Sequence, residues 1–325
     1  MVLRAAGGGS GSYADGMIVH EERSPGALAA EGRWPELLLR FRRARAAGAG
    51  SAGALGHLVA YGAPPELAAR LFDGDGGPGT AADTADHDAG PLWEVLATRH
   101  PWRRLAPLLE PPQVRRLVTH TRALLGENLA HDAEPDEEGV PLRLQVWEAA
   151  GWDEPGRVRE YLPGGGARLA VQALPALREG LGPVRLPEPG PPAPALAATR
   201  LLDGLAPWAR AVCVRGQAPD AAARLASERQ VTGGWLPFTA VYPALVQPAA
   251  APADRGAAQG RLAVWRLLAA MTGERRVVAA EVDALVARLR CFTWSEPDDE
   301  LSYLHLALED PATGLAWAVS GGAEV

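Results

Sequence analysis

The sequence contains no lysine, a single isoleucine (Ile18) and a single asparagine (Asn128), so all 32 basic side chains are arginine. Glycine and proline are abundant instead, with 37 and 29 of the 325 residues. Together they make up about a fifth of the chain, against an average near 12%. This profile is typical of a very GC-rich coding sequence. Much of the composition therefore reflects codon bias and says little about function.

Cysteine is also scarce, and only Cys213 and Cys291 are present. Two cysteines far apart in apolar surroundings form neither a disulfide framework nor a zinc pattern. They predict buried free thiols in a reducing compartment. No segment reaches the ~20 unbroken apolar residues that a membrane span requires, and residues 1–9 lack a signal-peptide hydrophobic region. We therefore expect a cytoplasmic protein without membrane association.

A net basic surface is missing as well. The formal charge is −7 and the isoelectric point is about 5.6. Nucleic-acid binding driven by phosphate contacts needs a basic face, so we expect no nucleic acid as partner. At 47% hydrophobic residues, the chain is still able to bury a substantial core.

The length suggests two domains of ~150 residues each. We expect a flexible tail over residues 1–24, a helical domain over 25–181 and an α+β domain over 196–325. Six prolines in residues 182–195 predict a stiff, extended linker between the two domains. Because the tail is rich in glycine and serine, we suspect that Met17 is the native start.

The first domain has helical spacing of apolar residues almost throughout. The expected helices cover residues 34–47, 91–99, 101–110, 112–130, 140–150 and 167–179, with short ones after Ser51 and over residues 64–72. Residues 73–90 are acidic and rich in glycine and predict a solvated loop. Short helices joined by Gly/Pro turns indicate antiparallel helix packing.

The second domain mixes helices with short strands. We expect helices over residues 196–205, 219–230, 259–271 and 277–289, and strands over 208–214, 235–242, 291–295, 302–308 and 315–319. A turn over residues 309–314 joins the last two strands into a hairpin. Alternation places one apolar face in the core, formed by Leu304, Leu306, Leu308, Leu315, Trp317 and Val319. The predicted fold class is α+β, mostly α, ending in a small antiparallel sheet.

The candidate catalytic residues are Glu296, Asp299 and His305, around the connection between two predicted strands. Paired carboxylates beside a histidine can support general acid–base chemistry if burial raises the pKa of one carboxylate. An acidic loop in water explains the same residues without catalysis.

The candidate binding residues are two arginines and two tryptophans. Arg40 and Arg43 belong to the strongest local positive patch, and a solvated helix face is the alternative reading. Trp152 and Trp235 lie beside glycines in apparent turns and would anchor a partner if exposed, since tryptophan is enriched at binding hot spots. Core filling is the alternative for the tryptophans.

No metal site or cofactor is expected. His120, Glu127 and His131 share one helix stripe, but His120 lies ~10.5 Å along the axis from Glu127, so we interpret the stripe as a polar, solvated flank. The triple glycine at residues 164–166 precedes no Lys, Ser or Thr, so it predicts a turn and not a phosphate loop.

These observations favour a non-catalytic interaction module that binds an unidentified protein partner through exposed tryptophans and arginines. The alternative is a hydrolase- or transferase-type enzyme that uses the carboxylate and histidine cluster. The first hypothesis assumes that the polar groups are scattered over the outside and do not meet in a sheltered interior.

Overall fold

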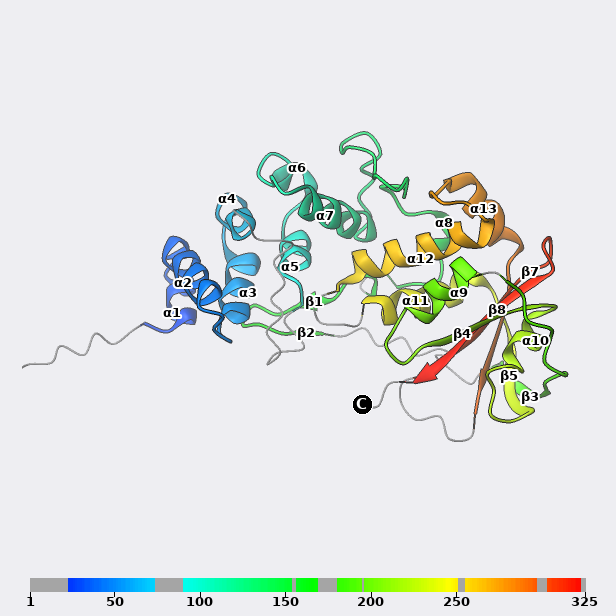
Figure 1. Cartoon of the computed structure of the whole chain (residues 1–325). Coiled ribbons are helices and arrows are strands. Elements are labelled where there is room, and N and C mark those ends of the chain that lie inside the picture. The colour runs from blue at the N-terminus through cyan, green and yellow to red at the C-terminus, as the bar shows by residue number, and fades with distance from the viewer. Residues whose placement is uncertain are drawn as a thin grey trace, which may run out of the picture.

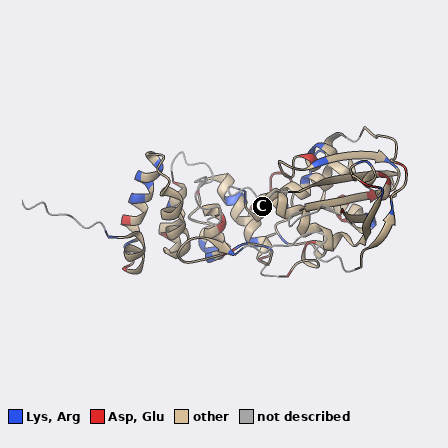
Figure 2. Ribbon diagram, turned by 90° about the horizontal axis from the view of Figure 1, so that it is seen from below, with Lys and Arg blue, Asp and Glu red and all other residues tan. Residues whose placement is uncertain are grey.

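The structure is a computed structural model, and it describes residues 23–73, 90–153, 156–168, 180–194, 196–250, 255–296 and 303–322. Most of the predicted tail, Met17 and most of the acidic loop lie outside these ranges. In the described part, helices α1–α7 occupy one end of an elongated molecule and a sheet occupies the other, with α11 and α12 between them (Figures 1 and 2).

The N-terminal half consists of short helices and one small hairpin. Its elements are α1 Pro25–Ala30, α2 Trp34–Ala46, α3 Ala52–Gly62, α4 Pro65–Ala68, the 3-10 helix η1 Ala69–Phe72, α5 Leu92–Arg99, α6 Trp102–Leu105, α7 Pro112–Leu124, α8 Val146–Ala149, β1 Glu160–Tyr161 and β2 Ala167–Arg168. The helices expected over 34–47, after Ser51, over 64–72 and over 91–99 are confirmed, although residues 69–72 of the third are a 3-10 helix. Their apolar stripes are buried, and α2 and α4 carry prolines suited to a first turn.

Four expected helices of this half differ from the structure. Only residues 102–105 of the helix expected over 101–110 are helical. Helix α7 ends at Leu124 because Gly126 adopts a φ of 94° and turns the chain away. Only residues 146–149 of the expected helix over 140–150 are helical. The helix expected from residue 167 is wrong at its start, since Ala167 and Arg168 form β2 and the glycines before them make the β1–β2 turn. Residues 169–179 lie outside the described part.

The C-terminal half contains a six-stranded antiparallel sheet of order β3-β5-β6-β7-β8-β4. Its elements are β3 Gly182–Arg185, α9 Leu196–Asp203, β4 Arg210–Arg215, α10 Ala218–Ala222, β5 Gln230–Leu236, α11 Phe238–Ala250, α12 Ala257–Thr272, α13 Ala279–Arg288, β6 Arg290–Ser295, β7 Tyr303–Asp310 and β8 Leu315–Gly322. An α+β fold, mostly α, is therefore confirmed.

The predicted hairpin of β7 and β8 is also confirmed, with Leu306 opposite Val319 and Leu308 opposite Trp317. These four side chains are buried in the main core, on the face of the sheet that packs against α9 and α11. The opposite face is covered as well, since α10 packs on it over a second apolar cluster that includes Ala307. Both faces of the central strands β6, β7 and β8 are therefore largely buried.

Two expectations in this half are wrong in extent. Residues 235–242 do not form a strand: β5 ends at Leu236, and α11 begins directly after Pro237. Proline lacks an N–H and suits the start of a helix, so it separates the two elements. Helix α10 is also shorter than the helix expected over 219–230, because the chain re-enters the sheet at Gln230.

The proline-rich segment 182–195 runs along the sheet. Its first residues form the edge strand β3, and Pro192 makes a bridge to Val214 of β4 at the opposite edge. Prolines fit sheet edges because an edge strand leaves outward N–H groups unpaired. The apolar core extends on both sides of this segment, and α12 packs against α7. The two-domain division remains a prediction.

Candidate functional site

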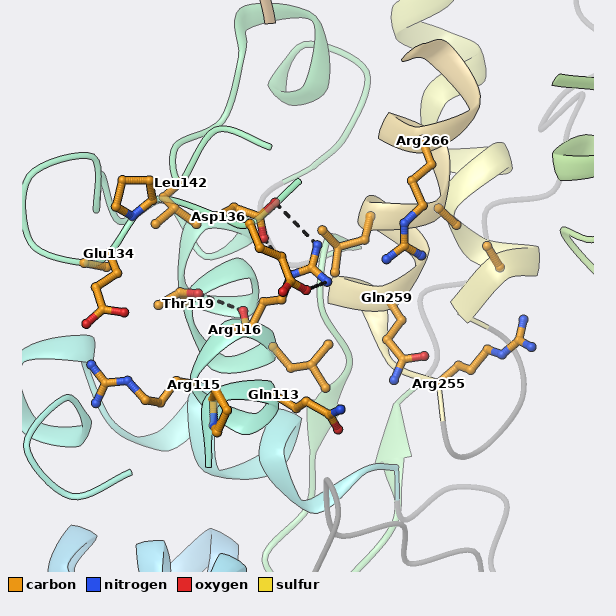
Figure 3. Close-up of a pocket in the computed structure, with 18 of the residues that line it drawn as sticks. Gln113, Arg115, Arg116, Thr119, Glu134, Asp136, Leu142, Arg255, Gln259 and Arg266 are labelled. Carbon is orange, nitrogen blue, oxygen red and sulfur yellow. Dashed lines mark hydrogen bonds and ion pairs between the residues drawn. The ribbon is translucent and has the colours of Figure 1, made fainter. Parts of the chain in front are cut away.

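A pocket of about 850 Å³ lies between α7, the loop over residues 133–142, α9 and α12 (Figure 3). Its size falls within the ~300–1,000 Å³ range of small-molecule sites. Five arginines and three carboxylates line it, namely Arg115, Arg116, Arg200, Arg255, Arg266, Glu134, Asp136 and Glu137. Leucines and alanines form the rest of the wall. The pocket therefore combines a positive balance of charge with an apolar surface.

Asp136 organises the polar side of this pocket. Its Oδ2 accepts a hydrogen bond from Arg116 Nε at 2.6 Å and lies 3.1 Å from His120 Nε2. Its Oδ1 accepts from the backbone N–H groups of Glu138 and Val140 at 3.0 and 3.2 Å. Burial alone would raise the pKa of Asp136, but the bonds from His120 and Arg116 hold it well below its usual range. Asp136 is thus a fixed anion that shapes the loop.

His120 lies behind Asp136, fully buried on α7. Its Nδ1 is 2.7 Å from Arg261 Nη1, and a guanidinium only donates hydrogen bonds. Nδ1 is therefore the acceptor, and the proton sits on Nε2, which donates to Asp136. Burial lowers the pKa of His120 to about 4, so the ring is neutral at physiological pH.

The network ends in a buried ion pair between α12 and α8. Arg261 Nε and Nη2 donate to the two carboxylate oxygens of Glu148 at 2.8 and 2.9 Å, and both side chains are 0% exposed. Tyr242 and Trp265 also donate to Glu148. Burial would raise the pKa of Glu148, but the adjacent Arg261 lowers it. Both oxygens are thus satisfied by charged or neutral donors.

This network overturns the assumption that the polar groups are scattered over the outside. Asp136, His120, Arg261 and Glu148 all have side chains with 0% exposure, and they form one continuous chain of hydrogen bonds. The reading of His120 as part of a solvated flank is wrong for the same reason, whereas His131 is exposed. In the described ranges, no cluster of three or more His, Cys, Asp or Glu side chains is arranged to hold a metal ion.

Not every arginine of the pocket is neutralised. Arg116 contacts Asp136, Glu137 and Glu138, and Arg266 also pairs with Glu138. In contrast, Arg200 and Arg255 are exposed and form no ion pair with any carboxylate of the described residues. Figure 3 shows Arg255, Gln259 and Gln113 on one side of the pocket and Glu134 with Arg115 on the other. The first side offers donors to an incoming anion.

The two predicted catalytic residues that the structure describes lie elsewhere, Glu296 directly after β6 and His305 on β7. The ring of Trp294 stacks on His305 with centroids 5.2 Å apart, and its Nε1 donates to Glu296 at 3.2 Å. Trp294 thus brings both residues to one place. Glu296 also accepts from Ser227, and His305 Nδ1 lies 2.8 Å from Ser320 Oγ. Asp299 lies outside the described residues, so the catalytic role of this cluster remains a prediction.

The predicted binding residues have different environments. Arg40 contacts Glu36 at 3.0 Å and is half-buried, whereas Arg43 is exposed on α2. Basic positions are blue on the ribbon in Figure 2. Trp152 is only 6% exposed and packs edge-on against Tyr242, so an exposed anchor at this position is excluded. Trp235 is 46% exposed, and the guanidinium of Arg290 lies 4.5 Å from its ring centre.

The sequence interpretation missed the pocket and its buried support. One signal was present: Arg261 shares a helical stripe with Val264, Trp265 and Leu268, so a charge lies on the apolar face of α12. His120 likewise lies between Leu117 and Leu124 at spacings of three and four. A charged group on an apolar stripe indicates a buried partner, but it does not say which one.

Comparisons with known proteins were made against family models, curated proteins and solved structures. No family model, curated protein or solved structure matches the chain.

Proposed function

We propose that this protein is a non-catalytic binding protein that recognises a small amphipathic anion in the pocket between α7, α9 and α12. The observation that carries the proposal is the pair Arg200 and Arg255, which are not neutralised by carboxylates of the described residues. Guanidinium groups bind carboxylate and phosphate oxygens through paired hydrogen bonds. The expected ligand therefore carries a carboxylate or phosphate.

The apolar wall determines the rest of the ligand. Leucines from four separate segments line the pocket, namely Leu117 of α7, Leu142 of the loop, Leu201 and Leu205 in and just after α9, and Leu262 of α12. Burial of apolar ligand surface contributes about 25 cal/mol per Å². An alkyl or aromatic body attached to the acidic group therefore fits this pocket better than an inorganic ion does.

The polar groups of the pocket favour binding over proton transfer. Both oxygens of Asp136 already accept hydrogen bonds, and its pKa lies far below neutrality. His120 is shielded behind it, with both ring nitrogens engaged. A general acid or base must reach the proton that it exchanges and titrate near the working pH. Neither side chain meets these two conditions.

The direct test is calorimetric titration of the full chain with octyl phosphate and with octanoate, with octanol as the uncharged control. We expect both anions to bind and octanol to bind much more weakly. Arg200→Gln and Arg255→Gln should each weaken binding about tenfold, which corresponds to ~1.4 kcal/mol. Arg185→Gln on β3 alters an exposed arginine outside the pocket and should have no effect. Equal binding of octanol, or full affinity in both pocket variants, contradicts the proposal.

A protein-interaction role remains a second candidate, supported by the exposed ring of Trp235 beneath Arg290. An exposed tryptophan with a stacked arginine is typical of interface hot spots. A photoreactive residue at position 235 should yield discrete adducts in cells, whereas the same residue at position 185 should not. Identical patterns at both positions argue against this surface.

The remaining expectations stay proposals. The hydrolase- or transferase-type alternative is supported by the shared contact of Glu296 and His305 with Trp294. A cytoplasmic location is supported by Cys213 and Cys291, which are buried and are not joined in a disulfide. No described helix has the length and apolar character needed to cross a membrane.

A further inference from the structure

A second buried carboxylate lies outside the pocket, at the start of α12. Glu94 of α5 is 0% exposed, and its Oε2 accepts the N–H of Ala257 at 3.1 Å. A Cβ at Gly256 would lie 1.6 Å from the same oxygen, so only glycine allows this close approach. Oε1 is buried and accepts no hydrogen bond of full geometry within the described residues, although the backbone N–H of Arg159 lies close enough to lower the pKa of Glu94 slightly. An unsatisfied buried carboxylate opposes folding, and such groups concentrate at functional sites.

The groups that face Glu94 come from the neighbouring elements. Arg159, just before β1, donates from Nη2 to Ala250 at the end of α11. Its Nη1 and the hydroxyl of Tyr161 on β1 are buried, and neither makes a hydrogen bond of full geometry within the described residues. Arg159 nevertheless lies close enough to Tyr161 to offset part of the rise in the pKa of Tyr161 that burial causes. His57 of α3 borders this junction through its edge-on contact with Tyr161, at 5.9 Å between ring centres. The junction therefore contains one cation, one phenol and one carboxylate, whose hydrogen bonds are incomplete.

The state of Glu94 affects how easily this junction opens. Burial raises the pKa of Glu94 from 4.5 to about 7, and the charge of Arg159 offsets this only in part. An opening that hydrates the carboxylate returns the pKa toward its ordinary value. By proton linkage, opening then becomes about tenfold more favourable between pH 6 and pH 8.

The same helix turn forms part of the pocket. Arg255 directly precedes α12 and Gln259 lies in its first turn, and both line the cavity. Displacement of this turn removes donors from the ligand. In addition, an ionised Glu94 repels an anion bound at this end of the helix. Both effects weaken anion binding when Glu94 loses its proton.

We infer that protonated Glu94 keeps the first turn of α12 in its closed position, a contact that we call the latch, and that the pocket then binds its anion more tightly. The ligand is therefore released as the pH rises above neutrality. The ligand half of this inference rests on the proposed function. The latch itself does not, because it concerns the opening of the junction in the ligand-free protein.

Hydrogen exchange of the ligand-free full chain tests the latch. After correction for intrinsic exchange rates, the opening constant of amides 257–262 should rise about tenfold from pH 6 to pH 8. Glu94→Gln mimics the protonated state and should abolish this rise. Glu274→Gln, at an exposed position just beyond the other end of α12, should behave like the wild type. A pH-independent wild-type opening constant, or a rise that persists in Glu94→Gln, overturns the latch.

Titration with octanoate, whose charge is constant over this range, tests the coupling to the pocket. Wild-type affinity should be about three- to tenfold weaker at pH 8 than at pH 6, and Glu94→Gln should bind equally at both pH values. Equal wild-type affinities overturn the coupling. Failure of octanoate to bind at either pH refutes the proposed function, while the exchange measurement still decides the latch.

Discussion

The buried pair of Arg261 and Glu148 allows a sharp test of the structure. Arg261→Met removes the cation but keeps an apolar side chain of similar length in a position with 0% exposure. Glu148 then keeps its bonds from Tyr242, Trp265 and the N–H of Gln145, but its charge is unpaired. Removal of one partner of a buried pair costs about 3–5 kcal/mol. Because three donors remain, we expect the lower end of this range.

The matched variants separate charge pairing from packing. Glu148→Gln alone should cost a similar amount, since it leaves Arg261 buried without a counter-ion. The double variant carries neither charge and should be about as stable as either single variant, with a coupling energy of about 3 kcal/mol. Arg266→Met on the same helix breaks an exposed pair with Glu138 and should cost less than about 1 kcal/mol.

Urea unfolding at several pH values measures these differences. In the wild type, the pKa of Glu148 is lowered, so its stabilising effect is present above its ordinary pKa and is lost as the pH falls below that value. In Arg261→Met, burial without the cation raises the pKa of Glu148. The penalty should therefore shrink as the pH falls from 8 to 5. Strictly additive costs, or a penalty that is the same at both pH values, would refute the reasoning.

Three further changes have expected outcomes. Glu94→Gln should stabilise the protein by about 3 kcal/mol at pH 8 and hardly at pH 4, because burial raises the pKa of Glu94 to about 7. Calorimetric unfolding measures this difference, and a destabilised variant at pH 8 contradicts the prediction. Gly151→Ala places a Cβ 1.7 Å from Thr239 O and should lower the free energy of unfolding, measured in urea, by about 2 kcal/mol or more. A Cβ at Gly26 meets no atom within 4 Å, so the control variant Gly26→Ala should be tolerated. Asp136→Asn should cost about 2 kcal/mol at pH 7 and almost as much at pH 4, because the bonds from His120 and Arg116 depress the pKa of Asp136 and its stabilising effect is complete above the ordinary value of 3.8. The cost should decline as the pH falls further below 3.8, and a cost in urea titrations that instead grows as the pH falls argues against the charged network.

Local pattern was sufficient for much of the fold. The helices α2, α3, α12 and α13 and the β7–β8 hairpin follow from apolar spacing, prolines at helix starts and a turn sequence, all of which act over a few residues. The errors fall where an apolar run continues past a local break. Pro237 divides such a run into β5 and α11, and Gly126 ends α7 before the apolar pattern stops.

The functional residues proposed from sequence had a different outcome. Trp235 is exposed as a docking residue requires, but Trp152 is buried against Tyr242, since a glycine neighbour does not indicate on which side a ring packs. Glu296 and His305 do meet through Trp294, on neighbouring strands. The pocket was not foreseen, because its arginines come from segments that are widely separated in the chain.

The sequence by itself determined many of the helices, the α+β class and the apolar face of the final hairpin, because each depends on the order of side chains over a few residues. Only the tertiary structure decided that Arg261 meets His120, 141 residues away, and Glu148, 113 residues away. A buried charge needs a partner of opposite sign or a hydrogen-bond acceptor, but sequence spacing does not specify which of many polar residues fills that place. The packing of α12 against α7 and α11 makes that choice, and it forms the pocket at the same time.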